Sequence, residues 1–213
     1  MDKQLVIKRL AACGVVAVIR AQKEEQLEGI VGALVEGGVI GIEVTMTTPN
    51  AIAGIAKLAE MFGERAVIGV GTVLDEGTAV KAMQAGAEFV VSPVLVKEVV
   101  EVTKQMGKVS VPGAFTPGEV LAAWRAGADV VKVFPATTLG PGYLKDLLAP
   151  MPFLKLTPTG GVDVKTAGAW IKAGAVMVGA GSSLVSKEMM AAGDWKGITA
   201  VARAFVEAVR EAR

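Results

Sequence analysis

One lysine and one glutamate lie inside stretches of sequence that are otherwise apolar. Lys132 stands in ADVVKVFPA (128–136), and Glu43 stands in GIEVTMTTP (41–49). Because burying an unpaired charge is costly, such residues need a chemical or structural reason to be there. An apolar surrounding favours a neutral amine, which can attack a carbonyl carbon and form a Schiff base. A carboxylate in the same interior can carry protons. The pair therefore indicates carbonyl chemistry.

Structural alternatives exist for both residues. Lys132 could pair with Glu43 or point outward between helices, and Glu43 could instead pair with Arg20, which ends the first apolar stretch. Lys155 is the other lysine within a strand-like run, but it lies nearer the start of that run, where it can face the helices and reach water. Thr45 shares the face of Glu43 by strand alternation, with Thr47 following.

Two glycine-rich turns indicate an anion site. TPTGGV (157–162) and GAGSSL (179–184) each follow an apolar run and precede a helical pattern. Backbone N–H groups exposed in such turns, next to helix N-termini, bind phosphate and similar anions. The candidate ligands are Gly160, Gly161, Gly181 and Ser182, and the alternative is plain turn geometry.

Eight extended apolar runs must position these residues, and a helical pattern follows each. Continuous apolar strands that alternate with amphipathic helices are typical of parallel βαβ units. We therefore expect a single (β/α)8 TIM-barrel domain over residues 1–213, with residues 2–12 forming an extra N-terminal helix; an open doubly wound sheet is the alternative. The expected strands are residues 15–20, 40–46, 66–73, 89–93, 109–114, 130–136, 153–161 and 175–182.

A weak repeat supports the barrel. A glycine, a small residue and a strand recur four times, and the glycine suits the left-handed position that closes a helix. In such barrels the active site lies at the carboxyl ends of the strands, which is where Lys132, Glu43 and the glycine turns are expected. The four glycines are Gly37, Gly86, Gly127 and Gly174.

The composition removes several classes of function. Among 213 residues there is no histidine, which excludes Ser-His and Cys-His nucleophiles and histidine-containing zinc sites. A net charge of +1 without charged blocks predicts neither nucleic-acid nor membrane-surface binding. Cys13 is the single cysteine, so no internal disulfide forms, and a cytoplasmic location is expected. No apolar run is long enough for a membrane span.

Seven ordered motifs resemble one known family. They are IEVTMTTPNA, GVGTVLD, FVVSPV, VPGAFTP, VVKVFPA, LTPTGGV and VGAGSSLV. The chain is similar over nearly its whole length to the 2-keto-3-deoxy-6-phosphogluconate (KDPG) aldolases, a family that includes the 4-hydroxy-2-oxoglutarate (KHG) aldolases. The resemblance implies a homotrimeric class I aldolase that needs neither metal nor cofactor. Such an enzyme cleaves KDPG to pyruvate and glyceraldehyde 3-phosphate in the Entner–Doudoroff pathway.

The resemblance also implies roles for individual residues. Lys132 matches the lysine that forms the Schiff base, and Glu43 matches the acid/base. Thr72 is implied to help hold the pyruvyl carboxylate, and Pro93 and Phe134 match positions in the pocket wall. Residues implied to border the substrate or bind its phosphate are Arg20, Thr159, Gly160, Gly161, Gly181 and Ser182.

One position departs from the family. Thr47 stands where many members carry an arginine that holds substrate carboxylate, so Arg20 is the candidate replacement. Relatives that act on the galactonate epimer look different at Thr159, where they carry an apolar residue, so PTGG favours the gluconate substrate. Two alternatives to this aldolase remain, a phosphate-sugar epimerase and a trimeric scaffold without activity.

Overall fold

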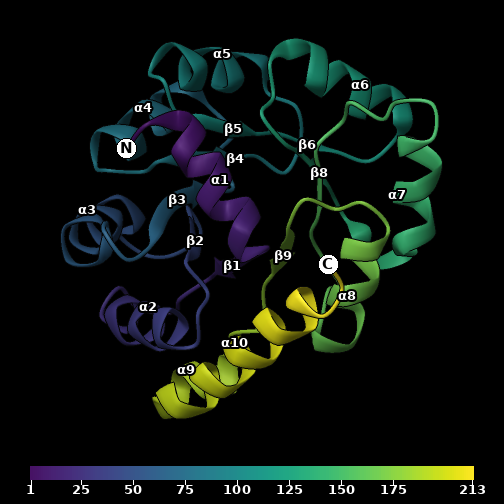
Figure 1. Ribbon diagram of the computed structural model, residues 1–213. Coiled ribbons are helices and arrows are strands. Elements are labelled where there is room, and N and C mark those ends of the chain that lie inside the picture. The colour runs from purple at the N-terminus through teal and green to yellow at the C-terminus, as the bar shows by residue number, and fades with distance from the viewer.

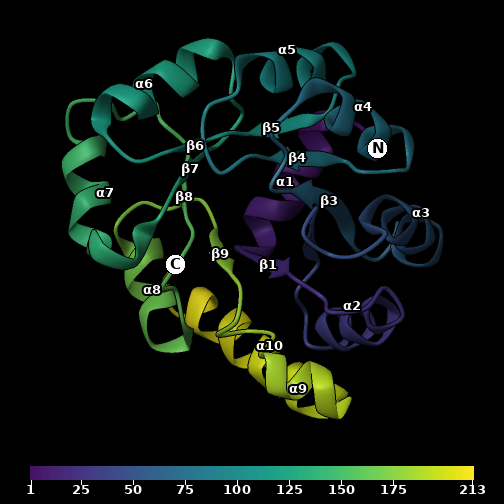
Figure 2. The ribbon, with the colours of Figure 1, turned by 180° about the vertical axis from the view of Figure 1, so that it is seen from behind.

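The computed structural model describes residues 1–213 and has an α/β fold. Most helices lie around the outside of the strands, whereas the first helix, in purple, crosses in front of them in Figure 1 and behind them in Figure 2. The helices are α1 (Lys3–Cys13), α2 (Gln26–Glu36), α3 (Ala51–Phe62), α4 (Glu76–Gln84), α5 (Lys97–Gln105), α6 (Pro117–Ala126), α7 (Gly140–Leu148), α8 (Val164–Lys172), α9 (Lys187–Ala192) and α10 (Trp195–Arg210). The strands are β1 (Val15–Ile19), β2 (Gly41–Thr45), β3 (Val67–Gly71), β4 (Phe89–Val91), β5 (Val109–Val111), β6 (Gly113–Ala114), β7 (Val131–Val133), β8 (Leu156–Pro158) and β9 (Val178–Ala180).

All strand pairings are parallel and run in a ring. β9, β1, β2, β3, β4 and β5 pair in that order, and β6, β7 and β8 form a second sheet. An isolated bridge between Thr159 and Gly179 links the end of β8 to β9. β5 and β6 continue one another across Pro112, which joins the two sheets. We call this arrangement the strand ring. The expected parallel α/β fold is confirmed.

Each expected strand contains a shorter observed strand, and the run 109–114 contains two. The break falls at Pro112, which has no N–H to donate to the ladder, although its carbonyl accepts from Lys132 N at 2.9 Å. Gly113 follows because the carbonyl of Pro93 packs against its Cα, where a Cβ would collide. The chain thus bends at this point while β6 stays in register with β7.

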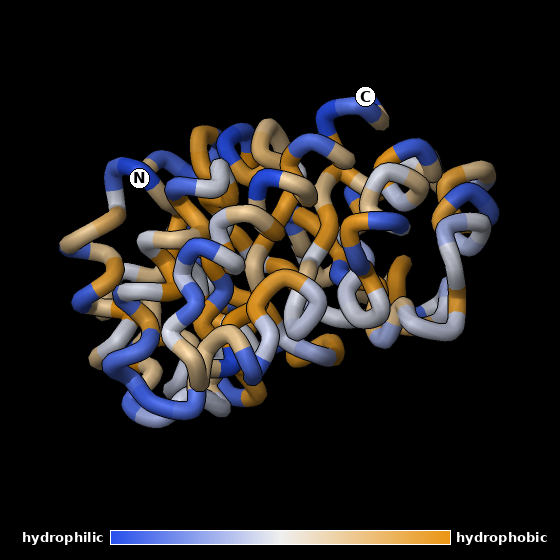
Figure 3. Tube along the Cα trace, turned by 90° about the horizontal axis from the view of Figure 1, so that it is seen from below, coloured by the Kyte–Doolittle hydropathy of each residue, from blue (hydrophilic) through white to orange (hydrophobic).

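Apolar side chains fill two layers. The larger cluster lies between the strands and the surrounding helices, and the smaller one lies inside the strand ring. Apolar segments pass through the middle of the trace, and many hydrophilic segments lie at its rim (Figure 3). None of the helices combines the length and the apolar character needed to cross a membrane.

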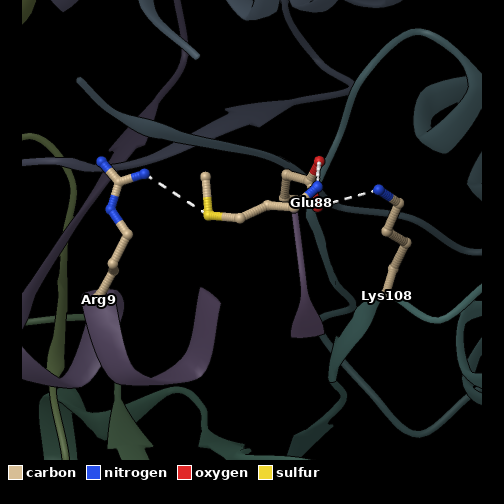
Figure 4. Close-up of polar contacts among 4 residues, drawn as sticks. Arg9, Glu88 and Lys108 are labelled. Atoms are coloured by element: carbon tan, nitrogen blue, oxygen red, sulfur yellow. Dashed lines mark hydrogen bonds and ion pairs between the residues drawn. The ribbon is translucent and has the colours of Figure 1, made fainter. Parts of the chain in front are cut away.

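Helix α1 packs where the strands begin. Val6 and Leu10 are buried against strand-start residues such as Val67 and Phe89 in the inner cluster. Charges nearby are paired: Lys108 Nζ lies 2.9 Å from one oxygen of Glu88, and the amino group of Met1 lies 3.0 Å from the other (Figure 4). Lys3 Nζ lies 2.9 Å from Asp129, whose carboxylate also accepts from Ser110 N. These contacts stabilise this end of the ring.

One glycine of the repeat was assigned the wrong conformation. Gly86, Gly127 and Gly174 have positive φ, as expected, but Gly37 has φ −78° and the next residue, Gly38, has φ 90°. Gly37 is needed for a different reason, since a Cβ there would collide with Ala202 of α10. Close packing of α10 on α2 therefore explains this glycine.

Candidate active site

Lys132 projects from the middle of β7 into the strand ring. Its residue partners are Gly113 on β6 and Thr157 on β8. The side chain is 4% exposed, and Nζ lies 4.9 Å from the centroid of the Phe134 ring. None of the ion pairs of the structure includes Lys132. The amine is thus buried without an ion-pair partner.

Glu43 projects from β2 into the same interior and is 3% exposed. It takes part in no ion pair, and its Oε1 has no hydrogen-bond donor. An unsatisfied buried acceptor costs about 1–3 kcal/mol, and more when it is charged. The expected structural alternative, a pair with Lys132 or Arg20, is not formed.

A small inner cavity brings the two residues together. Its accessible volume of about 10 Å³ is room for about one water molecule. Glu43, Lys132, Thr157 and Thr159 supply its polar groups, and the rest of its lining is Val16, Phe89, Val91, Val111, Met177 and Gly179. An amine and a carboxylate therefore border the same small cavity.

A larger cavity, the mouth cavity, opens at the carboxyl ends of the strands. Its volume is about 270 Å³, and it shares Thr159 and Gly179 with the inner cavity. Seven residues expected at the site line it: Arg20, Phe134, Thr159, Gly160, Gly161, Gly181 and Ser182. Thr159 therefore stands where the mouth and inner cavities meet.

The turns around the mouth cavity present free donors. The backbone N–H groups of Gly160, Gly161, Gly181 and Ser182 donate to no acceptor in the protein. Gly160 and Gly161 have φ values of 95° and 71°, a conformation that glycine adopts without strain. Ser183 Oγ donates to the carbonyl of residue 162 at 2.6 Å and so ties the two turns together. Such a cradle suits an anion.

Beside this cradle, a side-chain cap occupies one of the first N–H groups of α8, that of Thr166. Asp163 caps the helix, because its carboxylate accepts from Thr166 N at 2.8 Å and from Thr166 Oγ1 at 2.9 Å. The hydrogen bond from the Thr166 side chain, followed by that from its backbone, lowers the pKa of Asp163. The mouth cavity thus has one cation, Arg20, and one capped carboxylate.

Three expected residues line neither cavity. Thr47 is exposed, and its hydroxyl lies 2.7 Å from that of Thr45, which also donates to the carbonyl of Ile19. Thr72 follows β3 with φ 61°, and Pro93 packs its carbonyl against Gly113. Their backbones lie at strand ends, but their side chains do not enter the space that Lys132 borders.

Sequence reasoning did not single out Thr157 and Asp163. Strand alternation places Thr157 on the face of Thr159, which is a signal that could have found it. Asp163 stands three residues before Thr166, a spacing typical of a helix cap. Lys155 is exposed and borders a separate apolar cavity beneath α1. No group of three or more His, Cys, Asp or Glu side chains is placed to hold a metal ion.

Comparison with known proteins identifies relatives of this chain. Residues 6–201 match the family model for KDPG and KHG aldolase. The probable 2-dehydro-3-deoxy-6-phosphogalactonate aldolase of Rhizobium meliloti is 37% identical over 84% of each chain. The 2-dehydro-3-deoxy-phosphogluconate aldolase of Pseudomonas aeruginosa is 32% identical over 93% of this chain and 90% of its own. KDPG aldolase from Legionella pneumophila, with pyruvate captured as a covalent carbinolamine, superposes with a TM-score of 0.87 at 30% identity, covering 94% of this chain and 97% of that one.

Proposed function

This chain belongs to the KDPG and KHG aldolase family and is therefore a carbon–carbon lyase, and from that premise we propose that Lys132 is its Schiff-base nucleophile and Glu43 its acid/base. One observation carries the proposal: an unpaired lysine and an unpaired glutamate border the same inner cavity. The covalent carbinolamine of the Legionella pneumophila enzyme supports the same chemistry.

In the first half of the reaction, neutral Lys132 attacks the C2 ketone of the substrate. The resulting carbinolamine loses water and becomes a protonated imine. This imine can accept the electron pair of the C3–C4 bond when that bond breaks. Nζ lies 4.9 Å from the centroid of the Phe134 ring, and Lys132 lines the inner cavity, so the attacking nitrogen borders the space in which this step would take place.

In the second half, Glu43 removes the proton of the C4 hydroxyl, directly or through a single water, and the C3–C4 bond breaks. The aldehyde product leaves, and the electron pair remains on the enamine. Glu43 then returns its proton to C3, and hydrolysis of the imine releases pyruvate and regenerates Lys132. The unpartnered Oε1 is available to accept that proton because no donor of the protein occupies it.

We propose KDPG as the preferred substrate. The free N–H groups at Gly160, Gly161, Gly181 and Ser182 support binding of a phosphate in the mouth cavity. Arg20 supports binding of a second anionic group there, in place of the arginine absent at Thr47. Thr159, between the cavities, supports recognition of a substrate hydroxyl. The galactonate epimer is the alternative, since the Rhizobium meliloti relative is named for it.

Trapping with pyruvate tests the nucleophile. The enzyme is incubated with pyruvate and borohydride, digested, and mapped by mass spectrometry. We expect the reduced adduct on the peptide that contains Lys132. An adduct on Lys155 would assign the nucleophile to the wrong lysine, and the absence of any adduct would remove the Schiff base.

Kinetics on three substrates test the preference. We expect kcat/KM to be highest for KDPG, lower for its galactonate epimer, and lowest for KHG, which has no phosphate for the glycine turns. Equal values for KDPG and KHG would exclude a phosphate role for those turns. Pyruvate release from none of the three would favour the scaffold alternative.

We also propose that the chain is one (β/α)8 barrel domain over residues 1–213, with β5 and β6 as one interrupted strand and α1 as an additional helix. A homotrimer is proposed from Leu74, Val94 and Phe115, which are exposed beyond neighbouring strand ends. Light scattering tests it, and a monomeric mass would contradict it. A cytoplasmic location agrees with the single Cys13.

A further inference from the structure

Strand β3 carries two glycines whose missing side chains leave space inside the strand ring. An ideal Cβ at Gly71 would lie 2.6 Å from Cδ and 2.7 Å from Cγ of Glu43, and closer still to Oε1. Real Cβ atoms do not approach other heavy atoms this closely. The Glu43 carboxylate therefore occupies the volume that any side chain at position 71 would fill.

The position of the carboxylate is offset along the sheet. In the ladder between β2 and β3, Glu43 stands opposite Gly69, and Thr45 stands opposite Gly71. The Glu43 side chain thus leans two residues along β3, toward the carboxyl ends of the strands and the mouth cavity. This lean is possible only because position 71 has no Cβ.

The space directly opposite Glu43 is already filled. The ring of Phe89 covers Gly69, with Cδ1 and Cζ each 2.5 Å from where a Cβ would lie. Phe89 is 1% exposed and also lines the inner cavity. A Cβ at position 71 would displace the Glu43 carboxylate. The Phe89 ring fills the space over Gly69, so the carboxylate could not move to that side.

From these contacts we propose that Gly71 is a positioning residue: the absence of its side chain aims the Glu43 carboxylate at the inner cavity and leaves Oε1 without a partner. The proposal rests on the acid/base role proposed for Glu43. It also gives a reason why β3 ends on a glycine.

The central test is the variant Gly71→Ala. A misplacement of about 1 Å can lower a catalysed rate about 100-fold, so we expect kcat to fall by about that factor. Lys132 lies across the ring on β7, so pyruvate should still be trapped on it by borohydride. Wild-type kcat in a folded Gly71→Ala protein would overturn the proposal.

A double variant separates positioning from damage to the fold. When Glu43 is already alanine, the methyl group added by Gly71→Ala has no carboxylate to displace. The kcat of Gly71→Ala/Glu43→Ala should therefore equal that of Glu43→Ala within about threefold. If the two losses multiply instead, Gly71 acts independently of Glu43 and the proposal fails. Full activity in Glu43→Ala alone would instead remove the proposed acid/base role, on which this inference rests.

Stability provides a second readout if Gly71→Ala folds poorly. Removing the Glu43 side chain should then raise Tm of the double variant above that of Gly71→Ala, because the collision is relieved. A Tm that does not rise would contradict the proposal. Gly41→Ala is the matched control, since it lies on β2, where a Cβ would meet Leu10 at 2.9 Å and Val16 at 3.1 Å. It should lower Tm while kcat per folded enzyme stays within about twofold.

Discussion

The two ends of the strand ring use the same residue types in opposite ways. Where the strands begin, Lys108 and Glu88 form an ion pair at 2.9 Å, with side chains 20% and 17% exposed. Toward the other end, Lys132 and Glu43 are only 4% and 3% exposed, and neither has an ionic partner. Pairing satisfies the first two charges and contributes to stability. The second two have no ionic partner, which agrees with the reactive roles proposed for them.

Replacing Lys132 should produce the largest effect. Lys132→Ala removes the amine proposed to form the imine, so we expect kcat for KDPG cleavage to fall by at least about 1,000-fold. A coupled assay for pyruvate release measures it. Lys155→Ala is the matched control, and because Lys155 is exposed, that variant should keep wild-type activity. If Lys132→Ala retained activity, the unpaired lysine would not be the nucleophile, and the proposed difference in role between Lys132 and the paired Lys108 would be wrong.

Glu43→Gln should have the next largest effect, because it keeps the shape of the side chain and removes the carboxylate proposed as the base. General acid–base catalysis typically contributes about 100-fold to 10,000-fold, so kcat should fall within that range. Borohydride with pyruvate should still label Lys132. Single-turnover kinetics show whether C3–C4 cleavage is the slowed step, and an unchanged kcat would remove Glu43 from the mechanism.

Thr159→Val should change the preference between the two epimeric substrates more than it changes kcat. A hydrogen bond to a substrate hydroxyl is worth about 0.5–1.5 kcal/mol, so kcat/KM for KDPG should fall about two- to thirteenfold. The fall in kcat/KM for the galactonate epimer should be smaller. The family resemblance implies that relatives acting on that epimer carry an apolar residue at this position. Equal losses on both substrates would contradict a role in discriminating the epimers.

Glu88→Gln should affect stability alone. Losing the partner of Lys108 at a partly buried position should lower the free energy of unfolding by about 1–2 kcal/mol. Urea unfolding measures the change, and kcat should stay within about twofold. A large loss of activity would show that the two ends are coupled rather than separate.

Asp163→Ala should have the smallest effect, a loss of stability whose size depends on pH. The folded-state pKa of Asp163 is lowered by Thr166, so the carboxylate stabilises the fold above its unfolded pKa of about 3.9. That contribution is lost as pH falls through the folded-state pKa. Thermal unfolding at neutral pH should show a loss of about 0.5–1 kcal/mol, as for other helix caps. The difference in unfolding free energy from wild type should narrow as pH falls below about 3.9, and a constant difference would mean that the charge of Asp163 has no part in it.

The parallel fold and the place of the site were predictable because their signals are local. Apolar runs between helical patterns indicate parallel strands, and a charge within such a run is visible without any structure. Lys132 and Glu43 were expected to share an interior, and they line one cavity. Whether they formed an ion pair could not be predicted, because that depends on distances across the ring.

Other features depend on contacts that the local sequence does not contain. Thr47, Thr72 and Pro93 lie at strand ends as expected, but strand position alone does not say where a side chain at the rim points. The repeat could not decide whether Gly37 or Gly38 takes the positive φ. That choice depends on α10, where Ala202 packs against Gly37.

The single bridge between Thr159 and Gly179 makes one seam of the strand ring weaker than the others, because every other neighbouring pair of strands shares at least two residue pairs. Local opening should cost least there, so amide hydrogens along β8 and β9 should exchange with solvent sooner than those of β2 and β3. The glycine turns that follow β8 and β9 flank this seam. An anion bound by both turns would hold β8 and β9 together. Amide hydrogen exchange along these two strands would then slow as the ligand concentration rises.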